Sequence, residues 1–150
     1  MQFKLPARYS DVYWYGRGPH ECYSDRKAGA KLGLYAKALK DMHVPYIVPQ
    51  QNGDRVDTRF IEFVDKRSGK TLHIQSAKPF SFCVSQYTDE DLWKCEHTAE
   101  LSDTATGKNG FWTVSIDIAQ RGIGTAACGP DTLEEYKVRP GVYRLSFLVW

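Results

Sequence analysis

The feature that most constrains this chain is a series of short runs in which apolar and polar residues alternate, each bounded by Gly, Pro, Asn or Asp. The pattern recurs at 11–15, 55–64, 72–75, 80–87, 111–118 and 142–150. Successive side chains of a strand point to opposite faces, so such runs predict half-buried strands. Short strands separated by turn residues are typical of a sandwich or barrel. The sequence therefore predicts an all-β, antiparallel sandwich, with the runs at 111–118 and 142–150 as its clearest strands.

One or two short helices are expected beside these strands. Thr88 followed three residues later by Asp91 predicts a helix cap and a short connecting helix. The segment 27–41 is rich in Ala and Lys, which favours a helix, but Gly29 and Gly33 each weaken a helix interior. We therefore expect a helical turn after Ser24 and then a strand. The run at 11–15 is expected to stop at the glycines that follow it.

Length and composition indicate one domain, spanning residues 1–150. The formal net charge of +2 gives no electrostatic reason to expect nucleic acid or a membrane as partner. The longest apolar stretch, near 143–150, is far shorter than the ~20 residues of a spanning helix. The start also lacks the apolar segment of a signal peptide. We expect a soluble protein, cytoplasmic or periplasmic according to what precedes this segment.

The cysteines are expected to be free thiols, mostly buried. They are even in number but widely spread, without a C-x-x-C pair that would indicate a zinc site. An alternating run also surrounds one of them, where cysteine acts as a small apolar residue. The four are Cys22, Cys83, Cys95 and Cys128.

Three stretches hold more chemistry than turns require. The first, 16–26, places two glycines before a cluster of His, Glu, Asp and Arg. A dinucleotide site needs a helix that opens on a third glycine, and Pro19 and His20 break that pattern. The simpler interpretation is a turn that fixes the first strand, with an ion pair between Asp25 and Arg26.

The second and third stretches are 45–59 and 121–130. Two prolines and an Asn-Gly pair predict a rigid loop in the second. Arg55, Asp57 and Arg59 then recur at every second residue, which predicts a charged row on a solvated or inter-domain face. The third is glycine-rich and lets the backbone approach another surface closely. It could cradle a ligand or cross a sandwich edge.

No catalytic or metal-binding arrangement is evident from spacing. The four histidines do not show the spacing of a metal site. A glycosidase needs two facing carboxylates, whose separation depends on the fold, and no pair of glutamates is favoured here. Cys128 lacks an evident neighbouring base. We therefore predict no catalytic residue and no metal site in this chain.

In order and spacing, these stretches resemble the small chain, or C-terminal domain 5, of LacZ-type β-galactosidases of glycoside hydrolase family 2. The resemblance runs from about Tyr9 to Trp150. It rests on Gly16-Arg17-Gly18-Pro19-His20-Glu21-Cys22-Tyr23-Ser24-Asp25-Arg26, on Pro45-Tyr46-Ile47-Val48-Pro49-Gln50-Gln51-Asn52-Gly53, and on Gly122-Ile123-Gly124-Thr125 with Cys128-Gly129-Pro130.

The resemblance implies a supersandwich of the galactose-mutarotase type, of which this chain supplies the C-terminal part. It implies a non-catalytic domain that packs on a catalytic barrel and on upstream domains. The barrel would carry the catalytic glutamates, and the magnesium and sodium sites would lie outside this chain, which is expected to hold no cofactor. A galactoside is expected as ligand only in the intact enzyme, and the chain alone is expected to be inactive. Exposed strand edges predict that the isolated chain self-associates or is only marginally stable.

The resemblance also assigns residues. Gly124, Thr125 and Cys128 are expected at the rim of the substrate site, although some family members carry a Trp near the position of Cys128, and cysteine offers no aromatic face. The other motif residues are expected to be structural. They are Gly18, Pro19, Glu21, Tyr23, Asp25, Arg26, Pro45, Tyr46, Pro49, Asn52 and Gly53.

Two other functions are weighed beside this one. A free-standing carbohydrate-binding module would require several of Tyr13, Trp14, Tyr15, Trp93 and Trp112 to line one exposed face, although such aromatics more often belong to a core. An aldose epimerase is suggested by fold type alone. Its candidate acids and bases are His20, His73, Glu21 and Glu96.

Overall fold

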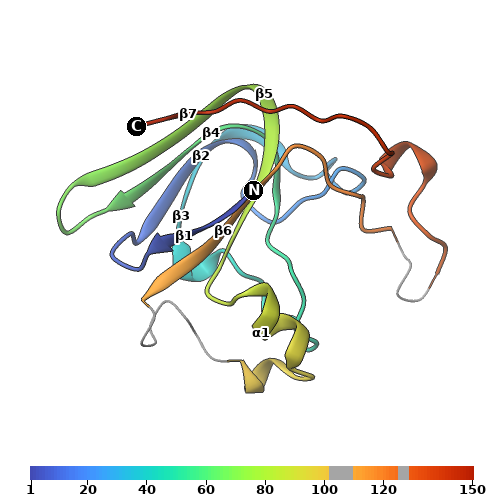
Figure 1. Ribbon diagram of the computed structural model, residues 1–150, viewed down its shortest axis with the longest axis horizontal. Coiled ribbons are helices and arrows are strands. Elements are labelled where there is room, and N and C mark those ends of the chain that lie inside the picture. Colours follow the sequence, from blue (N-terminus) through green and yellow to red (C-terminus); the bar gives the residue numbers. More distant parts are fainter. Residues whose placement is uncertain (102–109, 125–128) are drawn as a thin grey trace.

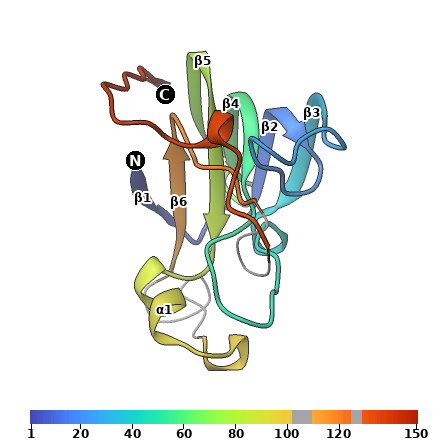
Figure 2. The same cartoon turned by 90° about the vertical axis from the view of Figure 1, so that its right-hand side faces the viewer.

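The computed structural model describes residues 1–101, 110–124 and 129–150. Its strands form one seven-stranded antiparallel sheet of order β1-β6-β5-β4-β2-β3, with β7 paired to β5 (Figures 1 and 2). The predicted all-β, antiparallel class is confirmed. The strands are β1 (Gln2–Pro6), β2 (Asp11–Gly18), β3 (Lys31–Ala38), β4 (Arg55–Asp65), β5 (Lys70–Ser85), β6 (Phe111–Asp117) and β7 (Leu148–Val149).

The helical elements are short. The predicted connecting helix is α1 (Asp89–Lys94), and its capping box is formed by Thr88 and Asp91 as expected. Three single-turn 3-10 helices are η1 (Leu39–Asp41), η2 (Thr98–Glu100) and η3 (Glu134–Tyr136). Among the described residues, no helix is long and apolar enough to cross a membrane.

One face of the sheet, called here the inner face, holds the hydrophobic core. Trp14 of β2 lies opposite Ile61 of β4, and Ile61 lies opposite Ile74 of β5. Residues directly opposite in an antiparallel pair share a face, so these side chains pack together. Trp14 and Ile61 are fully buried and belong to the same cluster. The core continues along β5 and β6 through Phe82, Val84, Val114 and Ile116.

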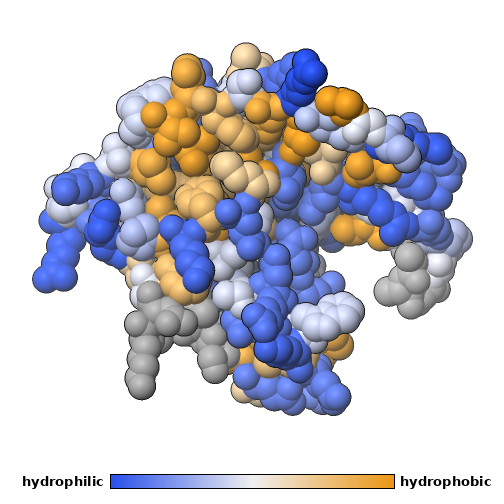
Figure 3. Space-filling model, viewed as in Figure 1, coloured by the Kyte–Doolittle hydropathy of each residue, from blue (hydrophilic) through white to orange (hydrophobic). Residues whose placement is uncertain are grey.

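The C-terminal stretch covers part of the inner face. Leu145 and Phe147 pack against the core, and the Phe147 ring meets the Phe80 ring edge to face at 5.7 Å. Figure 3 shows apolar side chains gathered around β7 and this stretch. The strand predicted at 142–150 is therefore mostly wrong, because only Leu148 and Val149 pair with β5. The same edge of β5 is occupied from Ser81 onward by β6.

Glycines continue β2 where the sequence predicted a stop. The strand runs through Gly16 to Gly18 because both glycines lie against other parts of the sheet. A Cβ on Gly16 would lie 2.5 Å from Thr58 Oγ1, and one on Gly18 would lie 2.9 Å from the Trp14 ring. Only a residue without a side chain fits such contacts. The runs at 72–75 and 80–87 also proved to be one strand, β5, and β1 was not predicted.

Two further predictions are confirmed. The segment after Gly29 is the strand β3, although turns rather than a helical turn precede it. The described cysteines are free thiols, Cys22 and Cys83 buried and Cys95 partly exposed. Cys128 lies outside the described residues.

Candidate functional site

The first two sequence motifs meet at Glu21, which lies buried in the loop after β2. Its Oε1 accepts a hydrogen bond from Arg26 at 2.8 Å and another from the Tyr46 hydroxyl. Its Oε2 accepts from the Gly53 backbone N–H at 2.9 Å and from the Tyr23 hydroxyl at 3.2 Å. One carboxylate therefore joins residues about thirty positions apart along the chain.

These donors keep Glu21 ionised. Burial by itself would raise the pKa of Glu21, but the hydrogen bonds from Tyr46, Gly53, Arg26 and Tyr23 outweigh it and hold the pKa below its usual value. The predicted ion pair between Asp25 and Arg26 is wrong, because Arg26 pairs with Glu21 instead. Adjacent residues of a turn point in different directions, which spacing alone does not show.

Asn52 and Gly53 fix the other end of the second motif. The Asn52 amide donates to the Val44 carbonyl at 2.7 Å and accepts from the Val44 N–H at 2.9 Å. Gly53 has a φ of 81°, and a Cβ there would lie 2.7 Å from the Met42 carbonyl oxygen. Both residues thus hold the loop in a single backbone conformation. On this loop, Pro45 is exposed and Pro49 is half-buried.

Asp25 connects the first motif to the third. Its carboxylate accepts from the backbone N–H of Ile123 at 3.1 Å and of Gly124 at 2.7 Å. A Cβ on Gly122 would lie 2.5 Å from Asp25 Cγ, and the Thr132 hydroxyl donates to the Gly122 carbonyl at 2.6 Å. The backbone at 122–124 is therefore held from both sides.

Of the three predicted rim residues, Gly124 is described. It is half-buried and has a φ of 58°, a conformation that favours glycine. Thr125 and Cys128 lie outside the described residues. The Asp25 contacts thus hold the backbone at Ile123 and at Gly124, the first of the predicted rim residues.

Arg55 is buried, whereas the sequence predicted it in a charged row on a solvated or inter-domain face. Register shifts in β4 between Arg55 and Phe60 break the strict alternation on which that prediction relied. The guanidinium donates to the carbonyls of Pro19 at 3.1 Å and Gly53 at 2.7 Å. It also lies over the Trp14 ring, 5.6 Å from its centroid. Pro19 and Gly53 are thereby tied to the core.

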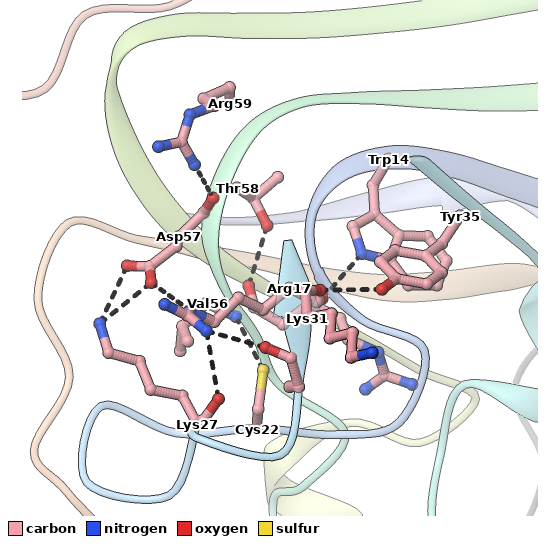
Figure 4. Close-up of polar contacts among 12 residues, drawn as sticks. Trp14, Arg17, Cys22, Lys27, Lys31, Tyr35, Val56, Asp57, Thr58 and Arg59 are labelled. Carbon is pink, nitrogen blue, oxygen red and sulfur yellow. Dashed lines mark hydrogen bonds and ion pairs between the residues drawn. The ribbon is translucent and has the colours of Figure 1, made fainter. Parts of the chain in front are cut away.

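Asp57 occupies the irregular part of β4 and has a φ of 53°. Its carboxylate binds Arg17 at 2.6 Å and Lys27 at 3.0 Å (Figure 4). Burial would raise its pKa, but these two cations outweigh that effect and lower it. Arg17 also donates to the Ala30 carbonyl at 2.8 Å. The cluster fixes the turn between β2 and β3 against β4.

Asp54 is a buried carboxylate that sequence reasoning did not single out. Its side chain is fully buried, and neither oxygen has a hydrogen-bond partner of good geometry among the described residues, although the Gln120 amide lies near enough to affect its pKa. Burial, followed by the nearby Asp117 charge, raises its pKa to about 7, although Arg55 and Gln120 act in the opposite direction. The run Asn-Gly-Asp-Arg reads as a polar turn, so no signal in the sequence marks this residue.

The motif side chains border open hollows. One of about 600 Å³ is lined by His20, Glu21, Asp25 and Arg26 among others. Within the described ranges, no group of three or more His, Cys, Asp or Glu side chains could hold a metal ion. Glu21 and Asp25 are already bound by hydrogen-bond donors. What this arrangement does chemically is to hold three loops in a fixed relation.

A comparison with protein-family models matches residues 1–149 to the β-galactosidase small chain. The chain belongs to this family. Among curated relatives, the β-galactosidase of Actinobacillus pleuropneumoniae is 29% identical over 98% of this chain. That of Kluyveromyces lactis is 32% identical over 97% of it, and that of Vibrio cholerae 36% over 83%. The chain spans only 14% of the first two relatives and 11% of the third.

The aromatic residues of the alternative sugar-binding interpretation do not line one face of this small-chain segment. Trp14 and Trp112 are buried in the core, and Trp112 donates to the Tyr9 carbonyl at 2.9 Å. Trp93 is 90% exposed, but it lies on α1. Tyr13 and Tyr15 share the outer face of β2.

Proposed function

We propose that this chain is a non-catalytic domain of a family 2 β-galactosidase, which hydrolyses terminal β-D-galactosides as an intact protein. The observation that carries the proposal is the coverage of the relatives. Proteins named β-galactosidase match nearly all of this chain but only 14% of their own length. In this proposal the chain is part of a larger, mutarotase-like small-chain domain that packs on the catalytic barrel and upstream domains.

The loop at 121–130 is proposed to contribute to the rim of the galactoside site. The contacts of Asp25 and Thr132 support this role, because they fix the backbone at 122–124, which includes the predicted rim residue Gly124. Backbone that is already held at 122–124 loses little further entropy when it helps to bind a ligand. Magnesium and sodium sites are assigned in this proposal to the domains outside the chain.

Hydrolysis of a chromogenic galactoside tests the proposal. The chain is assayed alone and after mixing with the Actinobacillus pleuropneumoniae β-galactosidase from which the matching segment has been removed. We expect no activity from either part alone and recovery of activity on mixing. Robust hydrolysis by the chain alone would contradict the proposal, because two of its own carboxylates would then form a catalytic pair.

A further inference from the structure

The face of the sheet opposite the core carries a second group of apolar side chains. The register places Leu34, Tyr15 and Phe60 in one row across β3, β2 and β4. Gln75 and Leu148 continue this row across β5 and β7. Partners in register share a face, so the residues of this row and of the next one are neighbours. We call the following set the outer strip: Tyr13, Tyr15, Leu34, Phe60, His73, Leu148 and Trp150.

Much of the outer strip is open to solvent. Leu34 is 73% exposed, Leu148 66% and Trp150 62%. Isolated exposed apolar residues are ordinary, but folded monomers rarely expose them in a contiguous group. The outer strip is continuous through the ring contacts of Tyr15, Phe60, His73 and Trp150. The polar residues Gln75 and Glu62 lie between other members in register. Such a surface is typical of a site where another molecule or domain binds.

Its aromatic rings contact one another in series, two pairs stacked and one tilted. The Trp150 and His73 rings lie 4.2 Å apart at 22°, and the His73 and Phe60 rings lie 5.2 Å apart at 21°. Tyr15 follows at 6.3 Å from Phe60, and the Arg59 guanidinium lies over the Tyr15 ring. The rings form a column that runs across β2, β4 and β5 to Trp150, which follows β7. Each inner ring covers the face of its neighbour.

This stacking decides which kind of partner the outer strip suits. A sugar ring binds by stacking on an open aromatic face. Neighbouring rings cover Phe60 and His73 on both sides, which leaves Trp150, 62% exposed, at the end of the column. Ring edges and leucine side chains suit a packed protein surface instead. Aromatic residues and arginine are also enriched in protein interfaces. The Glu62 carboxylate, 3.3 Å from His73 Nδ1, adds a polar group beside the outer strip.

We propose that the outer strip is the docking surface for another domain of the same β-galactosidase polypeptide. The inference rests on the proposed function and adds to it the face by which the chain binds the rest of the protein. The matched relatives place this segment within proteins of which it is only 14%. A domain on the same polypeptide also has a high effective concentration at this surface.

The test measures binding of the whole 150-residue chain to the Actinobacillus pleuropneumoniae β-galactosidase that lacks the matching segment. The test variant carries Leu34→Lys and Leu148→Lys, two exposed positions of the outer strip. The control carries Ile47→Lys and Trp93→Lys, which are 82% and 90% exposed and lie elsewhere. Circular dichroism and thermal melts verify that both variants are folded. We expect Kd to rise at least about tenfold for the test variant and to change less than about twofold for the control.

The outcomes separate the inference from the proposed function. If the test and control variants weaken binding equally, or not at all, the outer strip is not the docking surface, but the proposed function stays intact. No binding by the unsubstituted chain would overturn both. A dimer of the chain alone that Leu34→Lys and Leu148→Lys dissolve would make a second copy the occupant. Quenching of Trp150 fluorescence by galactosides would indicate that the outer strip binds a sugar. Dimerisation or sugar binding would each contradict the proposal that another domain docks there.

Discussion

At the residue scale, two buried carboxylates have opposite effects on stability. Glu21 is surrounded by donors and its pKa is lowered, so its ionised form stabilises the fold. Asp54 has no hydrogen-bond partner of good geometry among the described residues and its pKa is raised to about 7, so its ionised form destabilises the fold. Both are negatively charged at neutral pH in an unfolded chain, and burial affects each. The presence or absence of hydrogen-bond donors therefore decides whether the ionised carboxylate stabilises or destabilises the fold.

The first prediction concerns Asp54→Asn. Because folding raises the pKa of Asp54 from its ordinary value of 3.8 to about 7, the cost of ionising it is absent below about pH 4, grows as pH rises, and is complete above about pH 7. The Asn variant should therefore match the unsubstituted chain near pH 4 and exceed its stability at pH 8 by up to about 4 kcal/mol. Urea unfolding across this pH range measures the difference.

Asp41→Asn is the matched control for this experiment, because Asp41 is exposed. Its stability should lie within about 0.5 kcal/mol of that of the unsubstituted chain. A constant difference between Asp54→Asn and the unsubstituted chain from pH 4 to pH 8 would show that Asp54 does not titrate as inferred.

The second prediction concerns Asp25→Ala. This change removes both acceptors of the Ile123 and Gly124 N–H groups. We expect these two amides to exchange hydrogen at least about tenfold faster, with about 1–3 kcal/mol of local stabilisation lost. Exchange in the β2–β4 ladder should be unchanged, and Glu90→Ala, an exposed carboxylate on α1, serves as control. Unaltered exchange at Ile123 and Gly124 would mean that Asp25 does not hold this loop.

At the element scale, sequence patterns predicted strands better than they predicted where strands end. The runs at 55–64 and 111–118 correspond to β4 and β6. They were predictable because successive side chains of a strand point to opposite faces, so apolar and polar residues alternate. The glycines after the run at 11–15 look like a turn in sequence, yet they extend β2. Their role depends on Thr58 and Tyr35, which approach them from other strands.

The third prediction compares two glycines. Gly16→Ala places a Cβ 2.5 Å from Thr58 Oγ1 and 2.9 Å from Thr58 Cα, so it should destabilise the chain by about 2–3 kcal/mol. Gly29→Ala meets nothing within 4 Å and should be neutral or slightly stabilising. Chemical unfolding of both variants measures the difference. Equal stabilities would indicate that β2 can move away from β4 without cost.

At the scale of the whole molecule, the sheet has one face with a core and one with the outer strip. The strand order leaves β1 and β3 at the two ends of the sheet. The expectation that the isolated chain self-associates through strand edges therefore concerns these two strands, and it stays a prediction. The outer strip is a separate surface, because it lies on a face rather than on an edge.

The fourth prediction uses the tryptophans to ask whether the chain closes its core alone. Trp14 and Trp112 are 0% and 7% exposed, whereas Trp93 and Trp150 are 90% and 62% exposed. Acrylamide should therefore quench two distinct populations of the tryptophan emission. Replacing both Trp93 and Trp150 by Phe should leave emission that is shifted to shorter wavelength and weakly quenched. Uniform quenching of all four would show that the isolated chain does not form this core.

The fold class, the helix cap at Thr88 and the set of motif residues could be predicted from the sequence, because alternation, capping and turn chemistry are local properties. Which motif residues meet depends on the folded arrangement. Glu21 binds Gly53 and Asp25 binds Gly124 across gaps of 32 and 99 residues, and no local pattern encodes such distances. The tertiary structure likewise buried Arg55 and Asp54 and assembled the outer strip from five strands, since burial and a shared face depend on which strands become neighbours.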